Sequence, residues 1–313
     1  MKTTRSRLAQ ASMKNREDLP TERIKIVKVA FLGTGLMGLP MARRLLTHGI
    51  ETIAYNRTPE KLDPLRAAGA TVVESSRDAL QRCDCAVLML TDARAIREVV
   101  LSGSARDTVK GRAIVQMGTI APEESRSLAR EVSDLGGEYL EAPVLGSIPE
   151  AKAGNLLVMV GSTAPQFDRW RPLLQHFGED PRYIGEVGAA AAVKLALNQL
   201  IAALTAAFSL SLGFVRRQGA DVDAFMEILR QSALYAPTFD KKLSRMSDRD
   251  YENPNFPTKH LLKDTKLFLG ESQSLGLDDR ALDAVREILE AAIARNLAEM
   301  DYSALFEVVD PPR

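Results

Sequence analysis

A glycine-rich turn near the start of the chain has the spacing of a phosphate-binding loop. The segment Gly33-Thr34-Gly35-Leu36-Met37-Gly38 follows a predicted strand and opens a predicted helix. Gly33 permits the tight turn, Gly35 lets the backbone approach a pyrophosphate, and Gly38 allows close packing of helix on strand. The helix N-terminus offers free N–H groups and a positive dipole to phosphate. The pattern predicts a dinucleotide site, and a glycine-rich turn without a ligand is the alternative.

The end of the second predicted strand indicates which dinucleotide binds. Sites specific for NAD carry an acidic residue about 20 positions after the glycines, which holds the ribose 2′-hydroxyl. Here the strand ends in Ala54-Tyr55-Asn56-Arg57-Thr58, without an acid. Arg57 with the hydrogen-bonding neighbours Asn56 and Thr58 suits a 2′-phosphate. We therefore expect NADP(H) as the cofactor; the alternative is that Arg57 is a solvated surface residue.

A lysine stands at the start of a long segment without charge. No charged residue occurs in residues 195–215, directly after Lys194. A buried lysine is costly unless it is paired or used in chemistry. Lys194 and Asn198 are four residues apart and therefore share one helical face. The alternative is that Lys194 extends from the helix end into water.

The segment 195–215 is long enough to span a bilayer. It contains Asn198, Gln199, Thr205, Ser209 and Ser211 and is rich in alanine. We therefore interpret it as a helix buried inside protein and not as a membrane anchor. The chain has 41 Lys+Arg and 41 Asp+Glu among 313 residues, and this balance gives no support for a nucleic-acid or membrane partner.

The elements that position these residues alternate between strand and helix in the first part of the chain. Strands are predicted at residues 26–32, 52–55, 85–90, 113–117 and 156–160, with helices at 36–47, 59–67, 93–100 and 122–135. This alternation predicts a doubly wound parallel sheet of the Rossmann type, in the α/β class. After Gly188 the strand pattern stops, and helices are predicted at 189–218, 221–232, 258–275 and 278–296.

The predicted organisation has three parts. Residues 1–24 form a basic tail, 25–186 an NADP-binding Rossmann domain, and 187–313 an all-α domain that includes the long interdomain helix. Residues 1–16 hold five basic residues and no acidic one. We interpret this start as a disordered tail, or as an early start site with Met13 as the true beginning; a transit segment is the alternative. Cys83 and Cys85 are expected to be reduced thiols, and no metal site is expected.

At this point the sequence resembles a known family. The segment from Phe31 to Ala42 is similar to the opening signature of the β-hydroxyacid dehydrogenases, and Asn56-Arg57-Thr58 is similar to the members that prefer NADPH. The family includes 3-hydroxyisobutyrate dehydrogenases, tartronate semialdehyde reductases and glyoxylate/succinic semialdehyde reductases. The resemblance covers about residues 26–310. It implies a soluble oxidoreductase acting on a small carboxylate-bearing aldehyde or hydroxy acid.

The resemblance also assigns residues to the site. Leu90 and Thr91 match positions where the family contacts the cofactor, and Thr119 matches a threonine beside nicotinamide and substrate. The segment Ala142-Pro143-Val144-Leu145-Gly146-Ser147 matches the substrate-binding signature, with Leu145 where members usually carry a serine that helps to hold the substrate carboxylate. Without that serine, the substrate carboxylate would be bound by backbone N–H groups near Gly146 and by neighbouring side chains. Nothing in the sequence shows that Ser147 takes the place of the missing hydroxyl group.

The last two matches lie in the second domain. Residues 188–198 match the catalytic helix, which implies that Lys194 is the general acid/base and that Asn198 orients it or the substrate. Residues 256–264 match a segment in which Phe256 and Asp264 line the substrate side of the cleft and Lys263 reaches the cofactor. His260 has no matched role.

These observations predict NADPH-dependent reduction of a small aldehyde or keto acid, such as glyoxylate or succinic semialdehyde, to the hydroxy acid. An NAD-dependent 3-hydroxyisobutyrate dehydrogenase is the alternative within the family, and Arg57 argues against it. A non-catalytic or chromatin-associated relative and an imine reductase are further alternatives, and the presence of Lys194 argues against both. We expect a cytoplasmic homo-oligomer, a dimer or tetramer.

Overall fold

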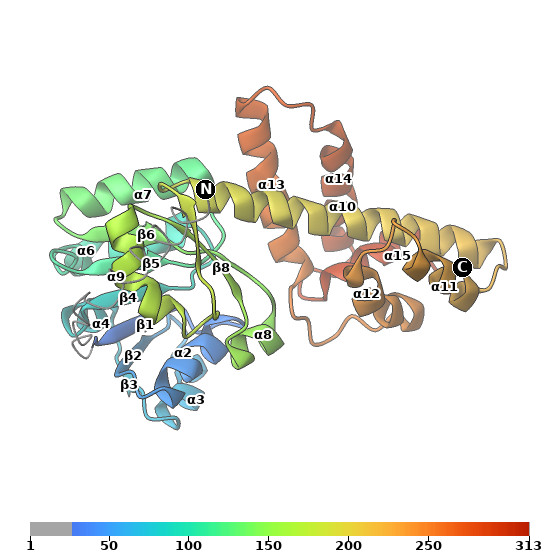
Figure 1. Cartoon of the computed structure of the whole chain (residues 1–313). Helices are drawn as coiled ribbons and strands as arrows, with labels where there is room; N and C mark the ends of the chain where they lie inside the picture. Colours follow the sequence, from blue (N-terminus) through green and yellow to red (C-terminus); the bar gives the residue numbers. More distant parts are fainter. Residues whose placement is uncertain (1–26, 313) are drawn as a thin grey trace, which may run out of the picture.

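The computed structural model describes residues 27–312. A sheet with helices on both faces forms the N-terminal part, and one long helix joins it to a C-terminal part made of helices (Figure 1). The expected fold class, a Rossmann-type α/β unit followed by an all-α unit, is therefore confirmed. The basic tail expected at residues 1–24 lies outside the described residues.

Nine strands form the sheet within the described part of the chain. Their bounds are β1 (Val29–Leu32), β2 (Thr52–Tyr55), β3 (Thr71–Val72), β4 (Cys85–Leu88), β5 (Ala113–Gln116), β6 (Glu138–Glu141), β7 (Val144–Leu145), β8 (Leu157–Gly161) and β9 (Arg182–Gly185). The order is β3-β2-β1-β4-β5-β6-β8-β7, with β9 beside β8. The order reverses between β1 and β4, so their carboxyl ends open a crevice of the kind in which ligands bind.

The pairing differs in one respect from the expected parallel sheet. The strands from β3 to β6 along this order are parallel, but β8 runs antiparallel to both β6 and β7. Only the short β7 and α8 (Ile148–Ala153) separate β6 from β8, so the chain returns without the long helical crossover that a parallel neighbour requires. The strands β3, β6, β7 and β9 were not predicted.

Successive residues of each strand supply the two faces of the sheet. Val29 and Phe31 point to a core that includes side chains of α2 (Gly38–Thr47) and α9 (Ala164–Leu174). Ala30 and Leu32 point to a second core on the opposite face. That core is covered by α4 (Ser76–Gln81), α5 (Ala93–Val100), α6 (Gly103–Arg106) and α7 (Pro122–Asp134). Both faces are buried, which is why the strands are nearly uninterrupted apolar runs.

The helix predicted at residues 59–67 is present but changes type along its length. The segment begins as the 3₁₀-helix η1 (Pro59–Leu62) and continues directly into the α-helical turn α3 (Asp63–Arg66). Pro64 lies in the first turn of α3 and has no N–H to donate to the preceding turn. The missing N–H of Pro64 removes one i→i−4 hydrogen bond close to the point where the helix changes type.

The C-terminal part is built around α10 (Ala189–Arg217), which crosses from the sheet to the far end of the molecule (Figure 1). Around it lie α11 (Val222–Gln231), α12 (Pro237–Asp248), α13 (Thr258–Ser274), α14 (Arg280–Ala294), η2 (Tyr302–Leu305) and α15 (Phe306–Val309). The last strand ends at Gly185 and α10 begins at Ala189, while the domain division at residue 187 stays a prediction.

The expectation that residues 195–215 are buried is only partly correct. One face of α10 is buried, including Asn198, Thr205 and Ser209. The opposite face exposes large apolar side chains: Leu210 is 66% and Phe214 64% exposed. Within the described residues α10 is the one helix long and apolar enough to cross a membrane by length and composition, and 39% of its most apolar window is buried in protein.

Candidate active site

The glycine turn adopts the geometry that its spacing predicts. Gly33 has φ +97°, and a Cβ there would overlap the carbonyl group of Met89 at the end of β4. A Cβ on Gly38 would overlap the carbonyl oxygen of Gly33, so α2 could not approach β1 so closely with a larger residue. Gly35 differs, because a Cβ there would meet nothing within 4 Å. The space beside Gly35 lies at the N-terminal end of α2, where N–H groups lack partners within the helix.

Asn56 connects the end of β2 to this turn. Its Oδ1 accepts a hydrogen bond from the Thr34 N–H at 3.1 Å, and its Nδ2 donates to the Thr58 carbonyl oxygen at 2.9 Å. The amide is therefore occupied in fixing the two loops against each other. Arg57 is exposed, and within residues 27–312 its guanidinium makes no hydrogen bond or ion pair. Thr58 is exposed too, and only its backbone carbonyl oxygen is bonded to Asn56, so the side chains of Arg57 and Thr58 are both available to a ligand.

A cavity of about 770 Å³ lies between the carboxyl ends of the strands and the C-terminal helices. Most of the residues predicted from the sequence line it. These are Gly35, Leu36, Met37, Gly38, Leu90, Thr91, Thr119, Leu145, Gly146, Ser147, Lys194, Asn198, Phe256, Lys263 and Asp264. Gly33, Thr34, Asn56, Arg57 and Thr58 lie outside the cavity, at the neighbouring ends of β1 and β2.

Lys194 lies in the first turns of α10 and is 8% exposed. Burial lowers the pKa of its ammonium group from the ordinary 10.5 to about 8; the Asp264 carboxylate opposes this shift and Lys263 adds to it. Within the described part of the chain Lys194 makes no hydrogen bond or ion pair. A buried, unpaired amine with a pKa near neutrality can both donate and accept a proton.

Asn198 and Asp264 form the floor of the cavity beside Lys194. Asn198 Nδ2 donates to Asp264 Oδ2 at 2.6 Å, and both residues are nearly fully buried. The other amide atom, Asn198 Oδ1, is buried without a hydrogen-bond partner among the described residues. An orphaned buried acceptor is costly, so its position on the cavity floor favours a donor from a bound molecule.

Lys263 joins the two parts of the molecule across the cleft. Its Nζ donates to the carbonyl oxygens of Thr91 at 3.0 Å and Thr119 at 2.6 Å, which follow β4 and β5. The same nitrogen lies 2.8 Å from Asp264 Oδ1, as an ion pair whose angles do not make a hydrogen bond. Lys263 therefore links α13 to the backbone of the two strand ends that carry the predicted cofactor residues Thr91 and Thr119.

The loop after β7 departs from a simple carboxylate-binding loop. Gly146 has φ +138°, which favours glycine, and Leu145 presents an apolar side chain to the cavity. Ser147 begins α8, and its N–H and hydroxyl group both donate to Glu150 Oε2, at 2.8 and 2.6 Å. The Ser147 hydroxyl proton is thus already donated to Glu150. Glu150 itself lines this wall of the cavity, and the sequence analysis did not identify it.

Glu141, at the end of β6, fixes the start of α10 and was also missed. Its Oε1 accepts hydrogen bonds from the N–H groups of Gly188, Ala190 and Ala191, at 2.8, 2.9 and 3.1 Å. Ser125 donates to the other carboxylate oxygen. Burial raises the pKa of Glu141, against these hydrogen bonds. The strand β6 carries a glutamate at each end, Glu138 and Glu141, so the sequence offered no signal that singled out Glu141 as the buried one.

Further side chains without a predicted role line the cavity from α12 and α13. Thr238, Lys241, Lys242 and Arg245 line the cavity from α12, a helix that the sequence pattern did not predict. His260 also lines it and stacks on Phe256, with ring centroids 6.5 Å apart and an interplanar angle of 4°. Burial lowers the pKa of His260 below its ordinary value, so its imidazole is neutral at pH 7.

Comparisons with known proteins place this geometry among dehydrogenases. Residues 28–188 match the NAD binding domain of 6-phosphogluconate dehydrogenase, and residues 188–309 match the NAD-binding domain of NADP-dependent 3-hydroxyisobutyrate dehydrogenase. The chain is 31% identical to glyoxylate/succinic semialdehyde reductase 2, chloroplastic, of Arabidopsis thaliana, over 97% of this chain and 84% of that protein. It is 32% identical to 2-hydroxy-3-oxopropionate reductase of Escherichia coli, over 91% and 97%.

Solved structures show the same fold. A 3-hydroxyisobutyrate dehydrogenase of Mycobacterium tuberculosis, described with L-serine, aligns with a TM-score of 0.81 at 22% identity. The alignment covers 91% of this chain and 99% of that one.

Proposed function

Because the chain belongs to the β-hydroxyacid dehydrogenase family of NAD(P)-dependent oxidoreductases, we propose that it reduces a small aldehyde acid with NADPH. The observation that carries this proposal is the buried, unpaired Lys194 amine at the floor of a cavity that begins at the glycine turn. The product is the corresponding hydroxy acid.

The residues of the glycine turn fit a dinucleotide. The open space beside Gly35 at the N-terminal end of α2 suits a pyrophosphate, which the N–H groups and helix dipole would hold. Arg57 would bind the 2′-phosphate of NADP(H), because its guanidinium is exposed and unpaired in the described structure. Leu90, Thr91 and Thr119 would line the nicotinamide end of the site. When bound, the nicotinamide supplies the hydride for the reduction.

Lys194 supplies the proton in this mechanism. As the aldehyde carbon is reduced, its oxygen gains negative charge, and the Lys194 ammonium group neutralises and protonates it. The pKa of about 8 leaves most of the amine protonated at pH 7, as an acid requires. In the reverse reaction the neutral amine removes the hydroxyl proton of the hydroxy acid.

Asn198 and Asp264 orient the reacting groups. The hydrogen bond from Asn198 Nδ2 to Asp264 Oδ2 fixes the amide, so that Asn198 Oδ1 remains as an acceptor. That acceptor can bind the Lys194 ammonium group or the substrate hydroxyl. Asp264 also favours the charged form of Lys194, since its carboxylate opposes the effect of burial on the pKa. Phe256 and His260 would exclude water from the same end of the cavity.

The substrate class rests on the relatives. They are named for glyoxylate, succinic semialdehyde and 2-hydroxy-3-oxopropionate, which are small acids with an aldehyde group. We propose that this chain acts on a compound of the same class. An NAD-dependent 3-hydroxyisobutyrate dehydrogenase remains the alternative within the family, and the unpaired Arg57 is the observation against it.

Assays with a panel of aldehyde acids, each with NADPH and with NADH, test the proposal. We expect turnover with NADPH on at least one of them, and kcat/KM for reduction that falls as the pH rises through about 8, because the acid form of Lys194 is lost. Oxidation of the hydroxy acid should rise through the same range. A reduction rate that is constant from pH 7 to well above pH 8 would contradict the role of Lys194, and efficient oxidation of 3-hydroxyisobutyrate with NAD alone would favour the alternative.

We also propose that the protein is a homo-oligomer. The exposed face of α10 carries Leu200, Leu204, Leu210 and Phe214, at 48, 36, 66 and 64% exposure. Apolar patches of this kind mark contact surfaces. Light scattering after size exclusion should give a mass at least twice the 34.3 kDa of the chain; a monomer would contradict the proposal.

A further inference from the structure

Five cationic side chains line the cavity. Four of them already have a partner or a proposed catalytic role. Lys194 serves the reacting oxygen in the proposed mechanism. Lys263 is held by Asp264 and by the carbonyl oxygens of Thr91 and Thr119. The other three, Lys241, Lys242 and Arg245, come from α12.

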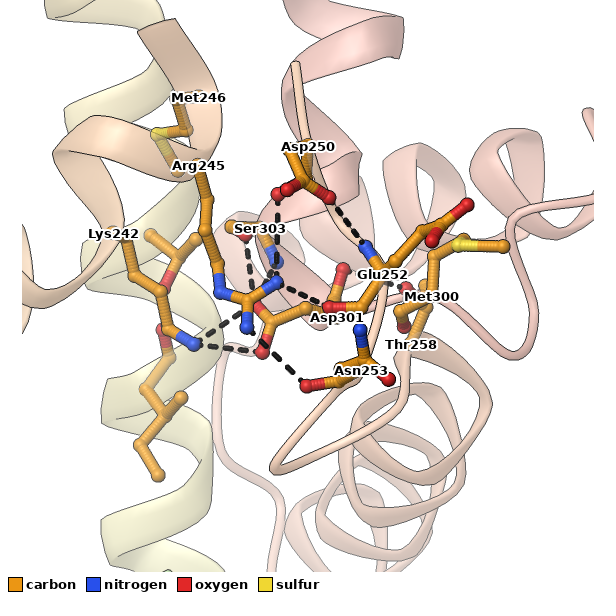
Figure 2. A network of polar contacts seen from close by, with 12 residues as sticks. Lys242, Arg245, Met246, Asp250, Glu252, Asn253, Thr258, Met300, Asp301 and Ser303 are labelled. Atoms are coloured by element: carbon orange, nitrogen blue, oxygen red, sulfur yellow. Dashed lines mark hydrogen bonds and ion pairs between the residues drawn. The ribbon is translucent and has the colours of Figure 1, made fainter. Parts of the chain in front are cut away.

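Lys242 and Arg245 have structural partners (Figure 2). Lys242 Nζ lies 2.8 Å from both carboxylate oxygens of Asp301, which is fully buried. Arg245 donates to three backbone carbonyl oxygens in the loop of residues 250–253, at 2.7 to 3.4 Å. Lys242 is thus neutralised by Asp301, and Arg245 holds the loop before α13. Neither can bind a substrate anion without giving up these contacts.

Lys241 differs from its neighbours on α12. It is exposed, and within residues 27–312 it takes part in no hydrogen bond or ion pair. Thr238, Lys241, Lys242 and Arg245 follow the i, i+3, i+4, i+7 spacing and share the helix face that lines the cavity. Lys241 is therefore a free cation at the rim of the cavity.

The wall formed by β7 and α8 opposes a substrate carboxylate. Two hydrogen bonds from Ser147 hold the pKa of Glu150 below its ordinary value, and the charge of Lys241 adds to this effect. Glu150 is thus ionised at pH 7 and repels an anion placed near Gly146. Leu145 offers no hydrogen bond there. The charges on the two walls direct an anion away from Glu150 and toward Lys241.

We propose that Lys241 binds the substrate carboxylate and selects aldehyde acids in which two or more carbons separate the carboxylate from the aldehyde. The inference rests on the proposed function. Lys194 is buried on α10, whereas Lys241 is exposed on α12, and both line the cavity, so a substrate that contacts both extends from a buried position toward the rim. In glyoxylate the carboxylate is bonded directly to the aldehyde carbon, which leaves no carbon chain between the two contacts. Succinic semialdehyde has the required separation.

The test compares Lys241→Gln with the parent on succinic semialdehyde and on butanal, which has the same chain length without the carboxylate. We expect KM for succinic semialdehyde to rise on the order of tenfold with kcat little changed, since a charge-assisted contact made equally in ground and transition states is lost. The butanal kinetics should not change. Lys152→Gln is the matched control, because Lys152 is exposed on α8 and does not line the cavity; its KM should equal that of the parent.

Two results would overturn the inference while leaving the proposed function intact: an unchanged KM for succinic semialdehyde in Lys241→Gln, or an equal rise for butanal. If the parent turns over no aldehyde acid, the proposed function fails first. Calorimetric titration of 4-hydroxybutyrate into the protein with NADPH then decides the inference separately. A Kd for 4-hydroxybutyrate that is about tenfold higher in Lys241→Gln than in the parent would support the inference. No binding to the parent, or the same Kd in both proteins, would contradict it.

Discussion

Replacing Lys194 with methionine should remove activity and stabilise the fold at the same time. The pKa of Lys194 is about 8 in the folded protein, against 10.5 for an ordinary lysine. At about 1.4 kcal/mol for each pH unit, burying the ammonium group costs about 3 kcal/mol of folding free energy at pH 7. Methionine keeps the length of the side chain without the charge, so this cost disappears.

The pH dependence of the effect follows from the sign of the shift. The folded-state pKa is lower than the unfolded one, so the unfolded chain holds this proton more tightly. The destabilisation is complete below about pH 8 and vanishes as the pH rises toward 10.5. The stability gained by Lys194→Met should therefore be largest at pH 7 and smaller at about pH 9.5.

Lys242→Met is the matched control, because Lys242 is also a buried lysine but has a buried partner. Removing Lys242 leaves the Asp301 carboxylate, which is fully buried, without its counter-charge. Breaking such a pair costs about 3–5 kcal/mol. The same substitution at the two lysines should therefore change stability in opposite directions.

Thermal unfolding and steady-state kinetics together measure the outcome. For a chain of this length a gain of about 3 kcal/mol raises Tm by about 5 °C. The kcat of Lys194→Met should fall by at least ~100-fold, while NADPH affinity from fluorescence titration stays close to that of the parent. A Tm at or below the parent at pH 7 would refute the buried-charge argument. A gain equal at both pH values would attribute the stabilisation to packing instead.

Three further predictions concern the cofactor and substrate walls. Arg57→Asp should weaken NADPH binding by about 2–4 kcal/mol and shift the preference toward NADH; unchanged cofactor preference in competition assays would show that another residue discriminates. Gly35→Ala should keep the parental Tm but lower NADPH affinity, because its Cβ enters open space, whereas Gly38→Ala should lower Tm, because its Cβ overlaps backbone. Leu145→Ser should lower KM for glyoxylate or succinic semialdehyde more than it alters kcat, and a large kcat change at constant KM would contradict that account.

The local parts of the site could be predicted from the sequence. The glycine spacing specifies a turn whose positive φ at Gly33 and close contact between Gly38 and Gly33 are set within a few residues, although the contact of Gly33 with Met89 is long-range. The four-residue spacing of Lys194 and Asn198 likewise determines a shared helix face. The local turn and the shared helix face can be derived without knowing how distant segments meet, and both geometries appear in the structure as expected.

The missed parts depend on contacts between distant segments. Glu141 and the N-terminus of α10 are separated by about 50 residues, and no local pattern links them. The helix α12 was missed because its buried face carries Phe239, Lys242 and Met246, so a lysine interrupts the apolar periodicity. That lysine is buried only because Asp301 neutralises it, a contact across 59 positions. The three cations of α12 that line the cavity were therefore missed together with the helix.

The anchoring of α10 on Glu141 has a consequence for the modularity of this enzyme. The carboxylate at the end of the Rossmann sheet takes its hydrogen bonds from Gly188, Ala190 and Ala191, which begin the helix that carries Lys194. In a chimaera joined after Gly185, Glu141 Oε1 would lose its three backbone donors and keep only the Ser125 hydrogen bond on Oε2, and the N–H groups at the start of α10 would lose their acceptor. The two parts therefore form one cooperative folding unit at this point. Recombination of cofactor and substrate modules must take its crossover inside α10, beyond Lys194, to keep that junction whole.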